Sequence, residues 1–200
     1  MRRFRLKGGF WLNLFSCVLI PGYTLWFAGS VAWFRTNFSV IAVTGVDNYR
    51  GFIYWGLLLG SYFLVMLTRL ALVLPRFRQR LALHLMTLGA CLCLAYALAI
   101  PYLPAYFPKY ATLHVLLAAL ASVLLMLALL LCLLVLRQRD REKYQRLLWA
   151  WLLITLVCGI LFFIPRMVSS ALEVFFSIAA TLLTRKLWLT CSEGSGAHPN

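Results

Sequence analysis

The sequence has few charged residues, and acidic residues are the scarcest of them. Only 12% of its 200 residues are charged, with five acidic residues against nineteen basic ones, while 64% are hydrophobic. Soluble domains carry about 25% charged residues, so the composition excludes an ordinary soluble domain. The net charge of +14 would suggest a nucleic-acid partner in a soluble protein. Here the basic residues lie between apolar runs, where they orient a membrane protein, and we expect no nucleic-acid partner.

Several motifs of enzymes and pumps are missing from the sequence. It contains no phosphate-binding glycine loop, no His-Glu-x-x-His and no Gly-x-Ser-x-Gly, so nothing supports nucleotide-driven transport. Cys91 and Cys93 are two positions apart and point to different faces of a helix, so they form no compact metal clamp by themselves. We therefore expect no cofactor and no metal site.

Long apolar runs dominate what remains, and a membrane span needs about 20 mostly apolar residues. The last run, 147–183, would measure about 55 Å as one helix against a hydrocarbon core of about 30 Å, so it must cross twice. Its turn is expected at Pro165, because proline fits the first turn of a helix. Gly56-x-x-x-Gly60 predicts close helix approach in the second span. The predicted spans are 10–34, 52–74, 81–103, 112–136, 147–164 and 166–184.

These spans predict an all-α bundle of six transmembrane helices in one domain, 1–189, followed by a disordered cytoplasmic tail, 190–200. One side of the membrane receives fifteen basic residues, namely Arg2, Arg3, Arg5, Lys7, Arg69, Arg76, Arg78, Arg80, Arg137, Arg139, Arg141, Lys143, Arg146, Arg185 and Lys186. The other side receives four, namely Arg35, Arg50, Lys109 and Arg166. The positive-inside rule therefore predicts that both termini are cytoplasmic, and a bacterial plasma membrane fits this bias.

Glu173 is the most informative residue, because a carboxylate within the bilayer is costly and marks a candidate functional site. Polar residues recur around it at steps of three and four, which places them on one helix face. That face is expected to point into the bundle, either as a polar seam with Glu173 held by Arg166 or a hydroxyl, or as a ligand site. The residues of this face are Arg166, Ser170, Glu173, Ser177, Thr181 and Thr184.

His114 enters the membrane from the same outer side as Glu173. With Lys109 and Arg166 it would form an anion-binding pocket under the first outer loop, or it would instead extend to the interface. This loop, Arg35–Gly51, is too apolar for a solvated linker; it is either a cap over the bundle or an ordinary connection. The candidate ligand-binding residues are Glu173, His114, Arg166, Ser170, Asn37 and Asp47.

Three short stretches carry a resemblance to a known family. They are Asn37–Ile41 followed by Gly45, His114 ahead of Leu116-Leu117-Ala118, and Glu173 followed by Val174-Phe175-Phe176. With these stretches in this order and six predicted spans, the chain resembles six-span bacterial membrane proteins that carry a domain of unknown function. The chain is more distantly similar to the superfamily of damage-regulated autophagy modulators and FGF-receptor-activating proteins. That superfamily has an acidic residue early in the outer loop, where this sequence has none before Asp47. The resemblance implies a polar pocket that opens outward.

Three functions remain as hypotheses. The leading one is binding of a membrane lipid, a small amphiphile or another membrane protein, with Glu173 and His114 holding a polar head group. The second is a small proton-coupled transporter in which Glu173 titrates during an inward–outward switch. The third is a membrane-embedded lipid-modifying enzyme with His114 and Glu173 as acid and base. It ranks last because ionisable groups are scarce, and no catalytic residue is assigned.

Overall fold

The computed structural model describes residues 9–29 and 32–194. This part of the chain is helical, and six of its helices are long and apolar enough to cross a membrane, which confirms the predicted fold class. The first of these is continuous through α1, a π-helical turn η1 and α2. The elements are α1 (Gly9–Asn13), η1 (Leu14–Leu19), α2 (Ile20–Ala28), α3 (Phe38–Ala42), α4 (Val46–Val73), α5 (Phe77–Ala99), α6 (Pro108–Arg137), α7 (Arg141–Phe163) and α8 (Ser170–Gly194).

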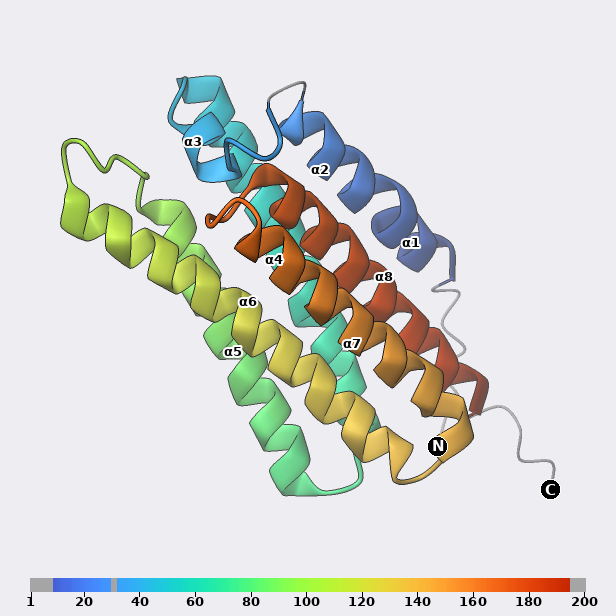
Figure 1. Cartoon of the computed structure of the whole chain (residues 1–200). Coiled ribbons are helices and arrows are strands. Elements are labelled where there is room, and N and C mark those ends of the chain that lie inside the picture. Colours follow the sequence, from blue (N-terminus) through green and yellow to red (C-terminus); the bar gives the residue numbers. More distant parts are fainter. Residues whose placement is uncertain (1–8, 30–31, 195–200) are drawn as a thin grey trace, which may run out of the picture.

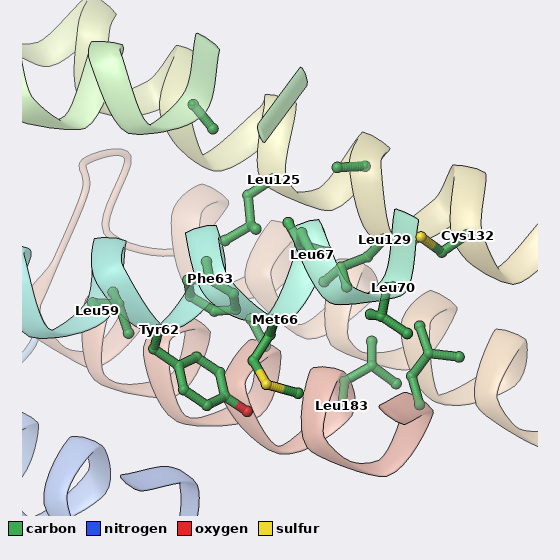
Figure 2. Close-up of a cluster of buried hydrophobic side chains, with 14 of the residues drawn as sticks. Leu59, Tyr62, Phe63, Met66, Leu67, Leu70, Leu125, Leu129, Cys132 and Leu183 are labelled. Atoms are coloured by element: carbon green, nitrogen blue, oxygen red, sulfur yellow. The ribbon is translucent and has the colours of Figure 1, made fainter. Parts of the chain in front are cut away.

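The long helices run along a common axis, with the short helix α3 at one end of the bundle (Figure 1). α1 begins and α8 ends at the opposite end. α4 packs against α2, α3, α5, α6 and α8. Figure 2 shows Met66 and Leu67 of α4 in a buried cluster with Leu129 of α6 and Leu183 of α8.

The outward faces of the helices are apolar and exposed. On α7, for example, Trp149, Leu153 and Leu156 are 61–63% exposed. A soluble protein rarely exposes contiguous apolar patches of this extent, and the bilayer supplies the missing cover. The chain is therefore a multi-pass membrane protein.

The first four helices differ from the predicted spans for local reasons. The first ends at Ala28 rather than at residue 34, because Gly29 adopts a φ of 56°, a left-handed conformation that terminates helices. The second begins early, at Val46. The third covers 77–99 rather than 81–103, because Pro101 holds Ile100 in an extended conformation. The fourth covers 108–137, with Pro108 in its first turn.

The last two helices also depart from the prediction. α7 begins at Arg141 rather than at residue 147, because the Asp140 side chain caps it by accepting from the Lys143 N–H at 3.1 Å. Pro165 does not start the sixth span: Arg166 has a φ of 54° and lies in a turn, and α8 begins at Ser170.

α8 continues to Gly194, so the predicted tail is wrong for residues 190–194. Thr190 and Cys191 are buried against the bundle, and the Tyr144 hydroxyl donates to Cys191 Sγ at 3.5 Å. This packing extends the helix beyond the apolar run. Residues 195–200 lie outside the described part of the chain.

Gly56 allows α4 and α5 to pack closely, as its motif predicts. A Cβ at this position would overlap Leu98 Cδ1 and would lie 2.9 Å from Leu98 Cγ. We expect Gly56→Ala to lower the free energy of unfolding by about 1–3 kcal/mol through overpacking, seen as a lower Tm in detergent. Gly22→Ala is the control, since its added Cβ meets no atom within 4 Å. Equal Tm values for the two variants would contradict this prediction.

Candidate functional site

A cavity of about 590 Å³ lies among helices α4 to α8 and reaches the predicted outer loop at Asn37 and Ser39. This volume is within the range of about 300–1,000 Å³ found for ligand sites. Its wall is mainly apolar, and it includes Phe52, Leu94 and Phe176. Of the described residues that line it, none is Lys or Arg and Glu173 is the one acid. The cavity therefore combines a large apolar space with a small polar region.

The outer loop folds back onto the bundle. The Asn37 side chain accepts a hydrogen bond from the Val40 N–H at 2.8 Å and so caps α3. Phe38 is completely buried, and its ring packs edge-on against Phe27 and Trp55 at centroid distances of 5.1 and 5.0 Å. These contacts make the loop a cap over the bundle, which is the alternative that its apolar composition favours.

Glu173 lies in the first turn of α8, where it meets this cap. The Phe38 N–H donates to Glu173 Oε2 at 2.6 Å. No described residue hydrogen-bonds to Oε1, so this oxygen is available to a ligand in the cavity that Glu173 lines. Glu173 therefore anchors the cap and also presents a polar atom to the cavity.

Two backbone amides at the start of α8 donate to carbonyls of the segment 33–36, which leads into this cap. The Ser170 N–H and hydroxyl both donate to the Thr36 carbonyl, at 2.7 and 3.1 Å. The Ala171 N–H donates to the Trp33 carbonyl at 3.0 Å. The first amides of a helix lack partners within the helix. These carbonyls therefore cap α8, and the same bonds hold the loop against the bundle.

His114 is 3% exposed, so the alternative that its side chain extends to the interface is wrong. Its Nδ1 lies 2.8 Å from the carbonyl oxygens of both Ala97 and Ile100. Carbonyls only accept hydrogen bonds, so Nδ1 carries the proton. In the neutral ring Nε2 is then an acceptor, and it lies 2.7 Å from Ser39 Oγ. The Ser39 hydroxyl therefore donates to Nε2.

The polar face of α8 points into the bundle, as its periodicity predicts. Ser170, Ser177, Thr181 and Thr184 are all at most 1% exposed. Within the described part of the chain, Ser177 Oγ and Thr181 Oγ1 are buried without a hydrogen-bond partner. An unpaired buried hydroxyl costs about 1–3 kcal/mol and calls for an explanation. Because Ser177 lines the cavity, a rotation of its buried side chain would bring this hydroxyl to a ligand.

The remaining predicted site residues lie elsewhere. Arg166 and Lys109 are exposed and do not line the cavity, so the predicted anion-binding pocket with His114 is wrong. α8 begins after Arg166, which removes this side chain from the helix face. Asp47 is exposed and lies 3.5 Å from Arg50, in the first turn of α4 where an acid complements the helix dipole. Ser170 is a structural anchor outside the cavity wall.

The structure thus brings Glu173, His114 and Asn37 to one cavity, and it adds residues that the sequence analysis did not select. Ser39 is the main omission. The capping signature of Asn37 was available to place Ser39 in the first turn of a helix. No local signal pairs it with His114, which is 75 positions away.

No family model, curated protein or solved structure matches this chain. The resemblance to six-span bacterial membrane proteins therefore stays a prediction. A helical bundle hosts many functions, so a functional proposal must come from the geometry of the cavity.

Proposed function

We propose that this protein binds one amphiphile from the membrane in the cavity among helices α4 to α8. The observation that carries this proposal is the pairing of an apolar cavity of about 590 Å³ with two polar residues in its wall, the acid Glu173 and Ser177, whose buried hydroxyl has no hydrogen-bond partner among the described residues. Apolar walls with few placed polar groups are typical of small-molecule sites. The tail of the amphiphile would occupy the apolar part, and its head group would lie at Glu173 and Ser177.

The lining residues restrict the chemistry of the head group. A phosphate or carboxylate would find no Lys or Arg among the described residues that line the cavity, and a buried charge without a partner is costly. Glu173 Oε1 instead favours a group that donates hydrogen bonds. The preferred ligand therefore has a hydroxyl or amine head group and no net negative charge.

We also propose that the polar end of the cavity lies toward the outer face of the membrane. The basic segments 76–80 and 137–146 lie where α4 is followed by α5 and where α6 is followed by α7, at the end of the bundle where α1 begins and α8 ends (Figure 1). The positive-inside rule assigns that end to the cytoplasm. α3, with its neighbours Asn37 and Glu173, is then on the outer side, and a bacterial plasma membrane fits this orientation.

Native mass spectrometry of the detergent-purified protein tests the binding proposal. We expect one amphiphile of this class on each protein molecule. Glu173→Leu removes the polar contact, so occupancy should fall at least about tenfold, equivalent to about 1.4 kcal/mol. Asp47→Asn is the control acid and should leave occupancy unchanged. An empty native protein, or equal occupancy in Glu173→Leu, would contradict the proposal.

Glu173→Gln identifies the head group, because glutamine keeps an oxygen that accepts from the Phe38 N–H. A hydroxyl head group should then stay bound with little change in Kd. An amine should bind at least about tenfold more weakly, since its charge-assisted hydrogen bond is lost. Titration of the delipidated native protein and of the delipidated variant with a long-chain alcohol and a long-chain amine measures these Kd values.

A proton-coupled transporter is the second candidate, because buried hydroxyls continue from Glu173 along α8. Ser177 and Thr181 are unpartnered within the described residues, and Thr184 follows on the same face. Such a column would serve proton movement only if Glu173 changes its protonation state. Glu173→Gln would then abolish proton flux in proteoliposomes that contain a pH-sensitive dye while amphiphile binding persists. Absence of proton flux in the native protein would exclude this candidate.

A further inference from the structure

Ser39 and His114 meet at the polar end of the cavity in the geometry of a nucleophile and its base. Ser39 Oγ lies 2.7 Å from His114 Nε2, within the reach that an activated serine requires. Nδ1 of the same ring is held by the carbonyls of Ala97 and Ile100. These carbonyls fix the tautomer and the orientation of the imidazole. In serine hydrolases the aspartate of the catalytic triad has this role.

The contact with Ser39 is not needed to position the histidine. The N–H at Nδ1, shared between the Ala97 and Ile100 carbonyls, already holds the imidazole, and the rings of Phe52 and Tyr102 lie beside it at centroid distances of 6.4 and 5.8 Å. Ser39 and His114 both line the cavity. The serine oxygen, whose proton points to Nε2, therefore has its lone pairs available to a molecule in the cavity.

Asn37, two positions before Ser39, adds a hydrogen-bond donor to the wall of the same cavity. Its Oδ1 accepts from the Val40 N–H at 2.8 Å, which identifies the other side-chain atom as the NH₂ group. Asn37 lines the cavity as well. An asparagine amide is a common donor to the oxyanion that forms when a serine attacks a carbonyl.

We propose that Ser39 is an acyl-accepting nucleophile, with His114 as its general base, acting on the ester of a lipid that occupies this cavity. The inference rests on the proposed amphiphile site, and it adds the reactive group that the amphiphile must carry. A monoacylglycerol fits, because its free hydroxyls would donate to Glu173 and Ser177 while its ester carbonyl reaches Ser39.

The reaction balances with water as the second substrate. His114 Nε2 takes the Ser39 proton as Oγ bonds to the acyl carbon, and Asn37 Nδ2 stabilises the oxyanion. The ester C–O bond then breaks, and the proton on Nε2 passes to the departing alcohol. Water repeats the sequence on the acyl-serine, so a fatty acid leaves and Ser39 regains its proton.

The test is covalent labelling of the purified full-length protein with a long-chain alkyl fluorophosphonate, followed by peptide mass mapping. We expect the adduct on Ser39 and its loss in Ser39→Ala. Ser61→Ala is the control, because Ser61 is exposed outside the cavity wall and its hydroxyl donates to the Leu58 carbonyl at 3.0 Å. It should be labelled at the native rate.

A second variant separates chemistry from folding. Asn37→Asp keeps the oxygen that caps α3 and removes the NH₂ donors, so hydrolysis of monoacylglycerol should fall about 10²–10³-fold with little change in bound lipid. The acyl-transfer inference is overturned if the label is not on Ser39, or if Ser39→Ala hydrolyses monoacylglycerol at the native rate. If amphiphile still copurifies in that case, the binding proposal stands; if the native cavity is empty, the binding proposal fails as well.

Discussion

Replacement of Phe38 by alanine is expected to lower the free energy of unfolding by about 3–5 kcal/mol, the cost of deleting a buried aromatic ring. Phe38 is fully buried, and its ring contacts Phe27 of α2 and Trp55 of α4. Its backbone N–H also holds Glu173. Loss of the ring therefore weakens the packing of the cap against α2 and α4. The loss of stability should appear as a large decrease in Tm in detergent.

Phe34→Ala is the control for this prediction. Phe34 belongs to the same outer segment but is 55% exposed, so its removal should change the Tm little. Amphiphile occupancy should fall in Phe38→Ala alone, since the cap positions Asn37 and Ser39 in the cavity wall. If both variants lose the same stability, burial of the Phe38 ring is not what fixes the cap.

Ala118→Phe is expected to abolish amphiphile binding without lowering stability. Ala118 lies one helical turn after His114 on α6 and lines the cavity. A phenyl ring placed there would occupy space that the ligand needs, at the level where the apolar part meets the polar groups. Occupancy measured by native mass spectrometry should fall at least about a hundredfold, equivalent to about 2.8 kcal/mol, while the Tm should hold or rise.

Leu120→Phe provides the matched control on the same helix. Leu120 is exposed on the outward face and is not part of the cavity wall, so the same added ring should contact lipid and leave occupancy unchanged. Retained ligand in Ala118→Phe would show that the amphiphile binds elsewhere on the protein.

The architecture was predictable because it follows from one energetic requirement. A run of apolar residues long enough to span a bilayer satisfies its backbone internally as a helix, and the sequence has five such runs, the last of which is long enough to cross twice. The inward face of α8 was predictable for a related reason: Ser177 and Thr181 recur at helical spacing, and hydroxyls avoid lipid.

The helix ends were less predictable because proline fits two positions. It is common in the first turn of a helix and also just after the end of one. Pro108 takes the first position and Pro165 takes the second. The error at Pro165 placed Arg166 on the polar face of α8, and the predicted anion-binding pocket depended on that placement.

The chemistry of the site was the least predictable part. The contact between Ser39 and His114 joins a short loop helix to α6, and the contact between Phe38 and Glu173 joins the same loop to α8. Both pairs are set by how the helices pack, and neither serine nor phenylalanine carries a local pattern that names its partner.

The bonds between the outer loop and α8 also bear on how the protein matures during synthesis. Trp33, Thr36 and Phe38 are translated early, yet their partners lie at 170, 171 and 173 on the last described helix. A nascent chain with only five inserted helices therefore lacks the α8 groups that hydrogen-bond to residues 33–38. It also lacks the part of the cavity wall that α8 contributes. The proposed ligand would therefore bind only after α8 is inserted, so the order of translation would delay loading of the cavity until all six long helices are in place.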